Sequence, residues 1–180
     1  MDTPLSPVSY PVTITRLPAK GQQVRFEADA DVRAALAEAQ GLVSVEQFVV
    51  DVLVTNWKGS GVAVKGTVSA KITQSCIVTL EPLVAEIHET IDSVFLPTNS
   101  KLLRFEDPSG EMVIDPEGAD SPEVLEGDKV DVGALAEEFF AIALDPYPRK
   151  EGVAPLEIIE DNEKPLNPLA EKLAALKGKL

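Results

Sequence analysis

The sequence predicts an α+β fold in which antiparallel strands form a curved sheet or a small open β-barrel with two packed helices and a C-terminal amphipathic helix. Residues 43–80 are rich in β-branched side chains, which favour strands. Residues 29–39 and 132–143 instead repeat apolar side chains at the spacing of an amphipathic helix. Apolar residues make up 44% of the 180-residue chain, enough to bury a core.

Two short strands are predicted near the N-terminal end. Residues 8–17 alternate apolar and polar side chains from Val12 onward, and Pro11 either places this strand at an edge or delays its start. A turn at Gly21 leads to the second strand, over residues 24–28.

A first helix is predicted to follow these strands. Asp29 or Asp31 can cap its beginning, and Gly41 stands where a C-terminal cap belongs after Ala39. Its apolar face consists of Val32, Ala35, Leu36 and Ala39.

The longest run of strand pattern extends from Val43 to Leu80. Residues 57–61 carry a glycine-rich turn signal within it, so the two halves are expected to pair as an antiparallel hairpin. Residues 84–96 favour a further strand, although their mixed apolar spacing leaves a helix open for part of the segment.

A loop and a second helix come next. Residues 97–129 contain seven proline and glycine residues among many acids, and predict a long acidic loop with a short strand at 112–114. Asp131 is expected to cap a helix over residues 132–143, which Asp145-Pro146-Tyr147-Pro148 stops.

The chain therefore divides into one domain and a tail. Residues 1–145 are expected to form the single α+β domain. Residues 146–180 are expected to be a proline-rich extended tail that ends in a short amphipathic helix at 166–179.

The net charge of −14 is unevenly distributed. Residues 1–80 hold seven acidic and seven basic side chains, whereas residues 81–163 hold 22 acidic and five basic ones. Residues 164–180 are basic, with four lysines and one glutamate. An acidic middle repels phosphate backbones and attracts cationic partners, which argues against a bulk nucleic-acid binder. A local basic patch in the neutral first half remains open.

The cysteine count and the apolar stretches bear on location. One cysteine can form neither an intramolecular disulfide nor a cysteine-based zinc site, which fits a reducing compartment. Residues 1–7 show no secretory signal, and apolar stretches such as 139–144 are too short to cross a bilayer. A cytoplasmic location without membrane association is expected.

No pattern of catalytic residues is evident. Cys76 could act as a nucleophile or redox thiol beside the only histidine, His88, but its neighbours Ile77 and Val78 favour a small packed residue in a strand. His88 is expected at the surface. The acids of residues 81–163 lack the spacing of a calcium loop and favour a solvated loop face. No enzymatic activity, cofactor or metal is therefore expected.

One local basic feature could bind RNA. Trp57 at the hairpin turn could stack on an unpaired base while Lys58, Lys65 and Lys71 contact phosphates. The alternative is a partly buried tryptophan that closes the core, with lysines on the outer face of the sheet. The candidate contacts with RNA or a protein partner are Trp57, Lys58, Lys65, Lys71, Arg149 and Lys150.

Three segments carry a resemblance to a known family. The first, residues 57–81, ends in Gln74-Ser75-Cys76-Ile77-Val78-Thr79-Leu80-Glu81. The second is Gly127-Asp128-Lys129-Val130-Asp131-Val132-Gly133-Ala134-Leu135-Ala136-Glu137-Glu138, an acidic entry into a helix. The third joins residues 144–150 to the terminal Asn167-Pro168-Leu169-Ala170.

In order and spacing these segments resemble the YceD family of large-subunit ribosomal RNA accumulation proteins. The signature positions are Cys76, Leu80, Asp128 and Asp131. Many members have Cys-x-x-Cys-Leu where this chain has Cys76 and Thr79-Leu80, and some carry further cysteines after the helix that look like a zinc site. Residues 145–150 hold no cysteine, so a bound metal is not expected here.

The resemblance implies a bacterial ribosome biogenesis factor that promotes synthesis, processing or stability of large-subunit (23S) ribosomal RNA, and it assigns no catalytic residue. Such a protein would bind the ribosomal RNA precursor, basic ribosomal proteins, or both, and neither DNA nor a membrane. The charge of residues 81–163 favours a basic protein as the partner of that segment. An acidic adaptor unrelated to ribosomes is the alternative.

Overall fold

A computed structural model describes residues 6–58, 60–100, 122–125 and 127–153. It confirms the predicted α+β class. In chain order the elements are β1 (Pro11–Thr13), a 3-10 turn η1 (Ile14–Arg16), β2 (Gln22–Glu27), α1 (Ala30–Ala39), β3 (Ser44–Trp57), β4 (Gly61–Ser75), β5 (Pro82–Pro97), β6 (Glu123–Leu125), β7 (Lys129–Asp131) and α2 (Val132–Ala143).

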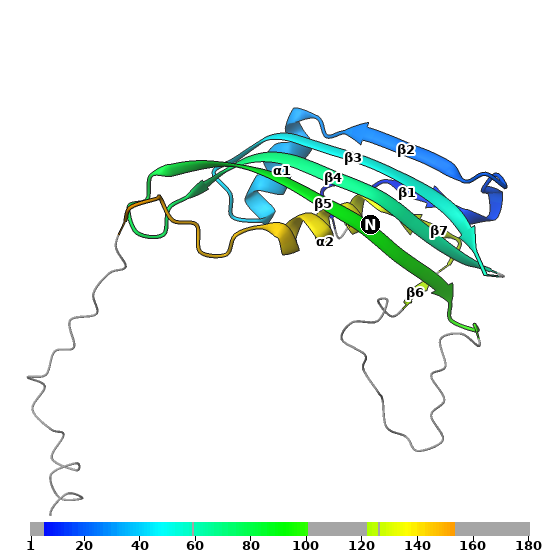
Figure 1. The fold of residues 1–180 in the computed structure, drawn as a ribbon. Coiled ribbons are helices and arrows are strands. Elements are labelled where there is room, and N and C mark those ends of the chain that lie inside the picture. The colour runs from blue at the N-terminus through cyan, green and yellow to red at the C-terminus, as the bar shows by residue number, and fades with distance from the viewer. Residues whose placement is uncertain (1–5, 59, 101–121, 126, 154–180) are drawn as a thin grey trace, which may run out of the picture.

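The main sheet has five strands in the order β2-β3-β4-β5-β6, and β1 pairs separately with β7. The pairs β2–β3, β3–β4 and β4–β5 are antiparallel, whereas β6 runs parallel to β5. Figure 1 shows the long strands β3, β4 and β5 bending together into an arch. Strands β2 and β6 stand at the two ends of this order and do not pair with each other, so the sheet is open. The curved-sheet alternative is therefore confirmed and the barrel alternative is wrong.

The hairpin predicted across residues 57–61 joins β3 and β4, which stay in register from Gln47–Lys71 to Trp57–Gly61. Near its centre, Gly66 lies so close to β3 that a Cβ added there would overlap the carbonyl oxygen of Asp51. A side chain would therefore force the two strands apart, so glycine permits the tight pairing at this point of the arch.

The helices predicted over residues 29–39 and 132–143 are confirmed and lie on the same side of the arch (Figure 1). The Asp29 carboxylate caps α1 by accepting a hydrogen bond of 2.9 Å from the Val32 N–H. On α2, Phe140 is fully buried and packs edge-on against Phe48 of β3, with ring centroids 5.4 Å apart. The core thus fills the space between one face of the sheet and the two helices.

Alternate residues of the central strands form the other half of this core. On β3 and β4 the fully buried side chains at these positions are Phe48, Val50, Val52, Val54, Val62, Val64, Val68 and Ile72. The intervening positions carry polar or charged groups such as Asp51, Lys65 and Lys71, because the opposite face of an antiparallel sheet can face water.

Two predicted strands are shorter than expected. The strand predicted over residues 8–17 pairs only at Pro11–Thr13, because Ile14–Arg16 turns into a 3-10 helix. The strand predicted to continue through Leu80 ends at Ser75, and residues 76–80 form a turn in which Leu80 has a φ of 59°.

The remaining predictions for the second half have mixed outcomes. Residues 84–96 are a strand throughout, within β5. Part of the predicted acidic loop forms β6, which the sequence did not indicate. The strand predicted at 112–114 and the helix at 166–179 lie outside the described residues. Neither described helix has the length and hydropathy to span a membrane.

Candidate functional site

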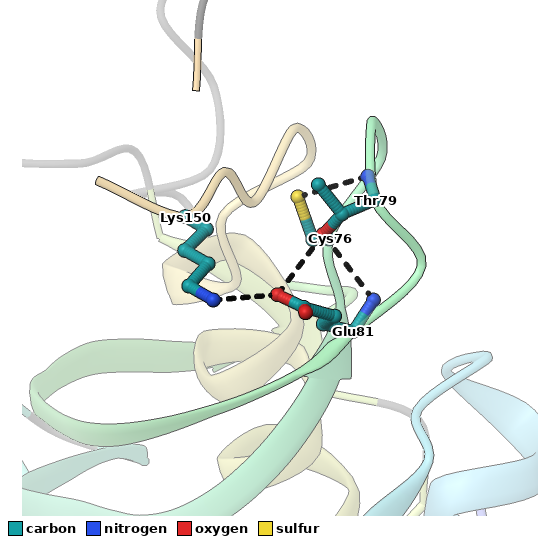
Figure 2. A network of polar contacts seen from close by, with 4 residues as sticks. All are labelled: Cys76, Thr79, Glu81 and Lys150. Atoms are coloured by element: carbon teal, nitrogen blue, oxygen red, sulfur yellow. Dashed lines mark hydrogen bonds and ion pairs between the residues drawn. The ribbon is translucent and has the colours of Figure 1, made fainter. Parts of the chain in front are cut away.

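The turn that contains Cys76 is tied together by backbone hydrogen bonds. The Cys76 N–H donates to the Glu81 carbonyl at 2.8 Å, and the Leu80 N–H donates to the Cys76 carbonyl at 2.9 Å. The Cys76 Sγ accepts from the Thr79 N–H at 3.5 Å, as Figure 2 shows. Hydrogen bonding by Thr79, through its side chain first and its backbone next, and by the Lys150 backbone lowers the pKa of Cys76 to about 6.

This lowered pKa does not make Cys76 an accessible nucleophile. Its side chain is 0% exposed, so a substrate cannot reach the sulfur without opening the turn. His88 lies on the outer face of β5, exposed as expected, and its Nδ1 is 2.8 Å from the Ser69 hydroxyl oxygen. Among the described residues, no group of three or more His, Cys, Asp and Glu side chains is placed to hold a metal ion.

The Cys76 turn also anchors the segment that follows α2. The Ile77 N–H donates to the Pro148 carbonyl at 2.9 Å, and the Gln74 side chain donates to the Asp145 carbonyl at 3.0 Å. The Lys150 ammonium pairs with Glu81 at 2.7 Å, which lowers the pKa of Glu81 and raises that of Lys150 (Figure 2). This signature region therefore joins the β4–β5 hairpin to the end of α2.

The second pair of signature positions holds the N-terminal segment against α2. Asp131 Oδ1 accepts from the Gly133 and Ala134 N–H groups, both at 3.0 Å, and caps the helix as predicted. The same carboxylate accepts from the Tyr10 N–H at 2.7 Å, while the Asp128 carbonyl accepts from the Ile14 N–H at 2.9 Å. The two contacts with the N-terminal segment give both residues a structural role beyond the predicted cap, and the sequence alone did not reveal it.

The predicted basic contact residues are dispersed over the molecule. Trp57 and Lys58 lie at the β3–β4 turn, where the Lys58 ammonium is 4.8 Å from the centroid of the half-buried indole ring. Lys65 pairs with Asp92 at 2.8 Å, and Lys71 faces Glu86 across the β4–β5 ladder. Their lysine charges are thus partly balanced by neighbouring acids.

The last two candidate contacts, Arg149 and Lys150, lie beyond α2 beside the Cys76 turn. Arg149 is exposed, whereas Lys150 is already engaged by Glu81. Lys65 and Lys71 are separated by six residues of extended strand, or roughly 20 Å. The structure does not gather the six candidates into one patch, and their role in binding stays a prediction.

Strand β5 forms an open edge of the sheet over most of its length. On one side it pairs with β4 without a shift in register, from Pro82 to Phe95. On the other side β6 pairs only with Phe95–Pro97, and no other strand in the described part of the chain lies there. Figure 1 shows β5 as the outermost long strand of the arch.

Acidic side chains border this open strand. Glu86 and Asp92 are exposed on its outer face, and Glu89 is half-buried on the face that carries the helices. On that same side, partial burial raises the pKa of Glu123 and the charge of Glu138 raises it further, while a hydrogen bond with Ser93 opposes the shift.

We call these five acids (Glu86, Glu89, Asp92, Glu123 and Glu138) the acidic edge. Only Asp92 forms an ion pair within the described residues. Since three of the others lie on the helix side, where their charges are not neutralised by a described cation, the acidic edge is suited to attract a cationic partner.

The sequence interpretation treated most acids of residues 81–163 as a solvated loop face and missed the edge. Its components come from β5, β6 and α2, which only the tertiary structure brings together. Charged residues within a predicted strand could have signalled it, because natural sheets place charges on exposed edge strands.

One of three comparisons with known proteins found a match. The family model of YceD, described as large ribosomal RNA subunit accumulation protein YceD, matches residues 64–177. A search of the curated proteins and a search of the solved structures found no match. The matched residues include most of β4 and all of β5, β6, β7 and α2, and so contain the acidic edge and all four signature positions. This chain belongs to the YceD family, whose description links it to the accumulation of large-subunit ribosomal RNA.

Proposed function

We propose that this protein is a non-catalytic ribosome biogenesis factor that acts in the cytoplasm. It promotes the synthesis, processing or stability of large-subunit ribosomal RNA by binding a basic ribosomal protein. The observation that carries this proposal is the acidic edge, within a segment of 22 acidic and five basic residues. Such a surface attracts cationic proteins over long distances and repels phosphate backbones.

The placement of the lysines supports a protein partner over direct RNA contact. Phosphate binding needs cations that are free to approach the backbone. Lys65 and Lys150 are instead engaged by acids at 2.8 Å and 2.7 Å, and Lys71 has Glu86 as its cross-strand neighbour. Each would have to exchange an acidic partner for a phosphate.

The surroundings of Cys76 and His88 support a binding role over catalysis. A nucleophilic cysteine works with an accessible sulfur and a base within hydrogen-bond reach. The Cys76 sulfur is enclosed and its described partner is the Thr79 N–H, while His88 contacts Ser69 on the exposed face of β5.

Affinity purification of the tagged protein from cells that make it, followed by gradient sedimentation, tests the proposal. The wild-type protein should carry large-subunit precursor particles or a basic ribosomal protein at low salt, with less recovered at moderate salt. A variant with Glu89→Gln, Glu123→Gln and Glu138→Gln should lose most of this material. A control with Glu27→Gln, Asp31→Asn and Glu38→Gln, which removes the same charge from exposed sites on β2 and α1, should retain it.

Two results would overturn the proposal. Equal recovery with both triple variants would show that the acidic edge is not the binding surface. Loss of the partner protein after nuclease treatment would show that RNA, rather than the protein surface, makes the link.

A further inference from the structure

The hydrogen-bond pattern of β5 fixes which of its backbone groups face outward. In an antiparallel pair, residues alternate between those that bond to the partner strand and those that point away. The Cys76 N–H bonds to the Glu81 carbonyl, so odd-numbered β5 residues bond to β4. The Thr73 carbonyl supports this alternation. It accepts from the Val43 N–H, beside β3, and therefore points away from Val84, its neighbour on β5.

Even-numbered residues of β5 therefore direct their N–H and C=O groups away from β4. They are Val84, Glu86, His88, Thr90, Asp92 and Val94. Both ends of this row are closed: Pro82 has no N–H, and β6 pairs with the strand from Phe95 onward. The open row spans roughly 35 Å, enough for a complete additional strand.

The chemistry of the row restricts what can pair with it. Pairing with β5 of a second copy would bring Glu86, Glu89 and Asp92 close to the same acids, and like charges across a strand pair are destabilising. A basic segment would instead meet acids on both faces, at Glu86 outside and Glu89 on the helix side.

The opposite edge of the sheet is less suited to the same role. Strand β2 has six residues, and its Arg25 and Glu27 balance in charge. Tyr10 also stacks on Phe26 of β2, with ring centroids 5.0 Å apart. The long, acidic and open row is thus specific to β5 among the described strands.

We propose that the β5 edge accepts an extended basic segment of a protein partner as an added strand, between Val84 and Val94. In this mode backbone hydrogen bonds provide binding, and the acids select lysine and arginine side chains. The identity of the partner as a basic protein rests on the proposed function, whereas the pairing itself rests on the backbone geometry of β5.

Short synthetic peptides of alternating lysine and valine test this pairing directly. One peptide is unmodified, a second is N-methylated at every lysine, and a third at every valine. Only alternate N–H groups of an added strand face β5, so one methylated peptide should bind at least about tenfold more weakly, an effect comparable to losing a net hydrogen bond, while the other retains most of its affinity. Purely electrostatic binding would treat the two methylated peptides alike.

Two protein variants at one exposed site provide a matched comparison. Thr90→Pro removes an outward N–H without removing a bond to β4, whereas Thr90→Ala keeps that N–H. The proline variant should bind the unmodified peptide about tenfold more weakly and the alanine variant about as well as wild type. If the proline variant misfolds, amide hydrogen exchange on the wild-type protein tests the same pairing. The N–H groups of Glu86, His88 and Thr90 should exchange rapidly in the free protein and slow on peptide binding.

Equal affinity for the two methylated peptides, with unchanged exchange at these amides, would overturn strand addition while leaving the charge-based function intact. Selective binding by one methylated peptide without recovery of any ribosomal particle would support strand addition and reject the ribosomal role. Sedimentation of the protein alone as a dimer that Thr90→Pro dissociates would assign the edge to a second copy and overturn the inference.

Discussion

Replacing Asp131 with alanine should destabilise the protein, because it removes a carboxylate that holds the start of α2 and the N-terminal segment together. Its Oδ1 accepts from the Gly133 and Ala134 N–H groups at the start of α2, and from the Tyr10 N–H at 2.7 Å. Its Oδ2 accepts from the Ser9 hydroxyl at 2.6 Å. Loss of the cap costs about 1 kcal/mol, and the two contacts with the N-terminal segment add roughly 0.5–1 kcal/mol each.

The free energy of unfolding should therefore fall by about 2–3 kcal/mol in Asp131→Ala. For a chain of this size the melting temperature should drop by about 5–10 °C. Urea and thermal unfolding followed by circular dichroism measure both quantities. Asp131→Asn is the control, because asparagine caps helices about as well as aspartate, and it should lose only about 0.5 kcal/mol. An unchanged stability in Asp131→Ala, or equal losses in the two variants, would show that the Asp131 carboxylate does not hold α2 and the N-terminal segment together.

Three further variants probe other parts of the fold. Phe140→Ala should cost about 3–5 kcal/mol in urea unfolding, because it empties a fully buried site against Phe48; a loss under about 1 kcal/mol would contradict that packing. Gly133→Ala should speed proteolysis near Val8, since a Cβ there overlaps the Val8 carbonyl oxygen and would detach the N-terminal segment; unchanged proteolysis would count against this contact. The folded pKa of Cys76, about 6, lies below its ordinary value of 9.0, so the contribution of the thiolate to stability is full above that ordinary value and is lost as the pH falls through about 6. The free energy of unfolding of wild type, relative to that of Cys76→Ala, should thus increase as the pH rises from about 6 to 9.0. A constant difference would show that folding does not favour the thiolate.

The elements set by local signals were predicted well. The helix over residues 132–143 has the bounds of α2, because its cap Asp131 and the proline-rich stop after it act within a few residues. Helix α1 and the β3–β4 turn were likewise predicted by a capping aspartate and a glycine-rich turn.

The Cys76 turn could not be predicted from neighbouring residues alone. Ile77 and Val78 favour a strand, yet the chain turns there and Leu80 takes a positive φ that leucine rarely adopts. The Ile77 N–H bonds to the Pro148 carbonyl, and this contact with a distant segment helps to hold the turn. Tertiary structure therefore overrides local propensity at this signature position.

The acidic edge was missed for a related reason. Composition showed that residues 81–163 are acidic, but it did not show that β5 is the outermost long strand of the sheet, with only the three-residue β6 beyond it. That position depends on long-range pairing, and the parallel pairing of β6 with Phe95–Pro97 depends on where the chain returns after a long connection. Which acids border an open strand is thus a property of the topology.

The ratio of large- to small-subunit ribosomal RNA in depleted cells is the direct measure of whether the acidic edge carries the function. Cells that lack the protein are complemented with wild type, with the Glu89→Gln, Glu123→Gln, Glu138→Gln variant, or with the Glu27→Gln, Asp31→Asn, Glu38→Gln control, at matched protein levels. Wild type and the control should restore the ratio, whereas the acidic-edge variant should leave it low. Full restoration by the acidic-edge variant would contradict the claim that this surface carries the function.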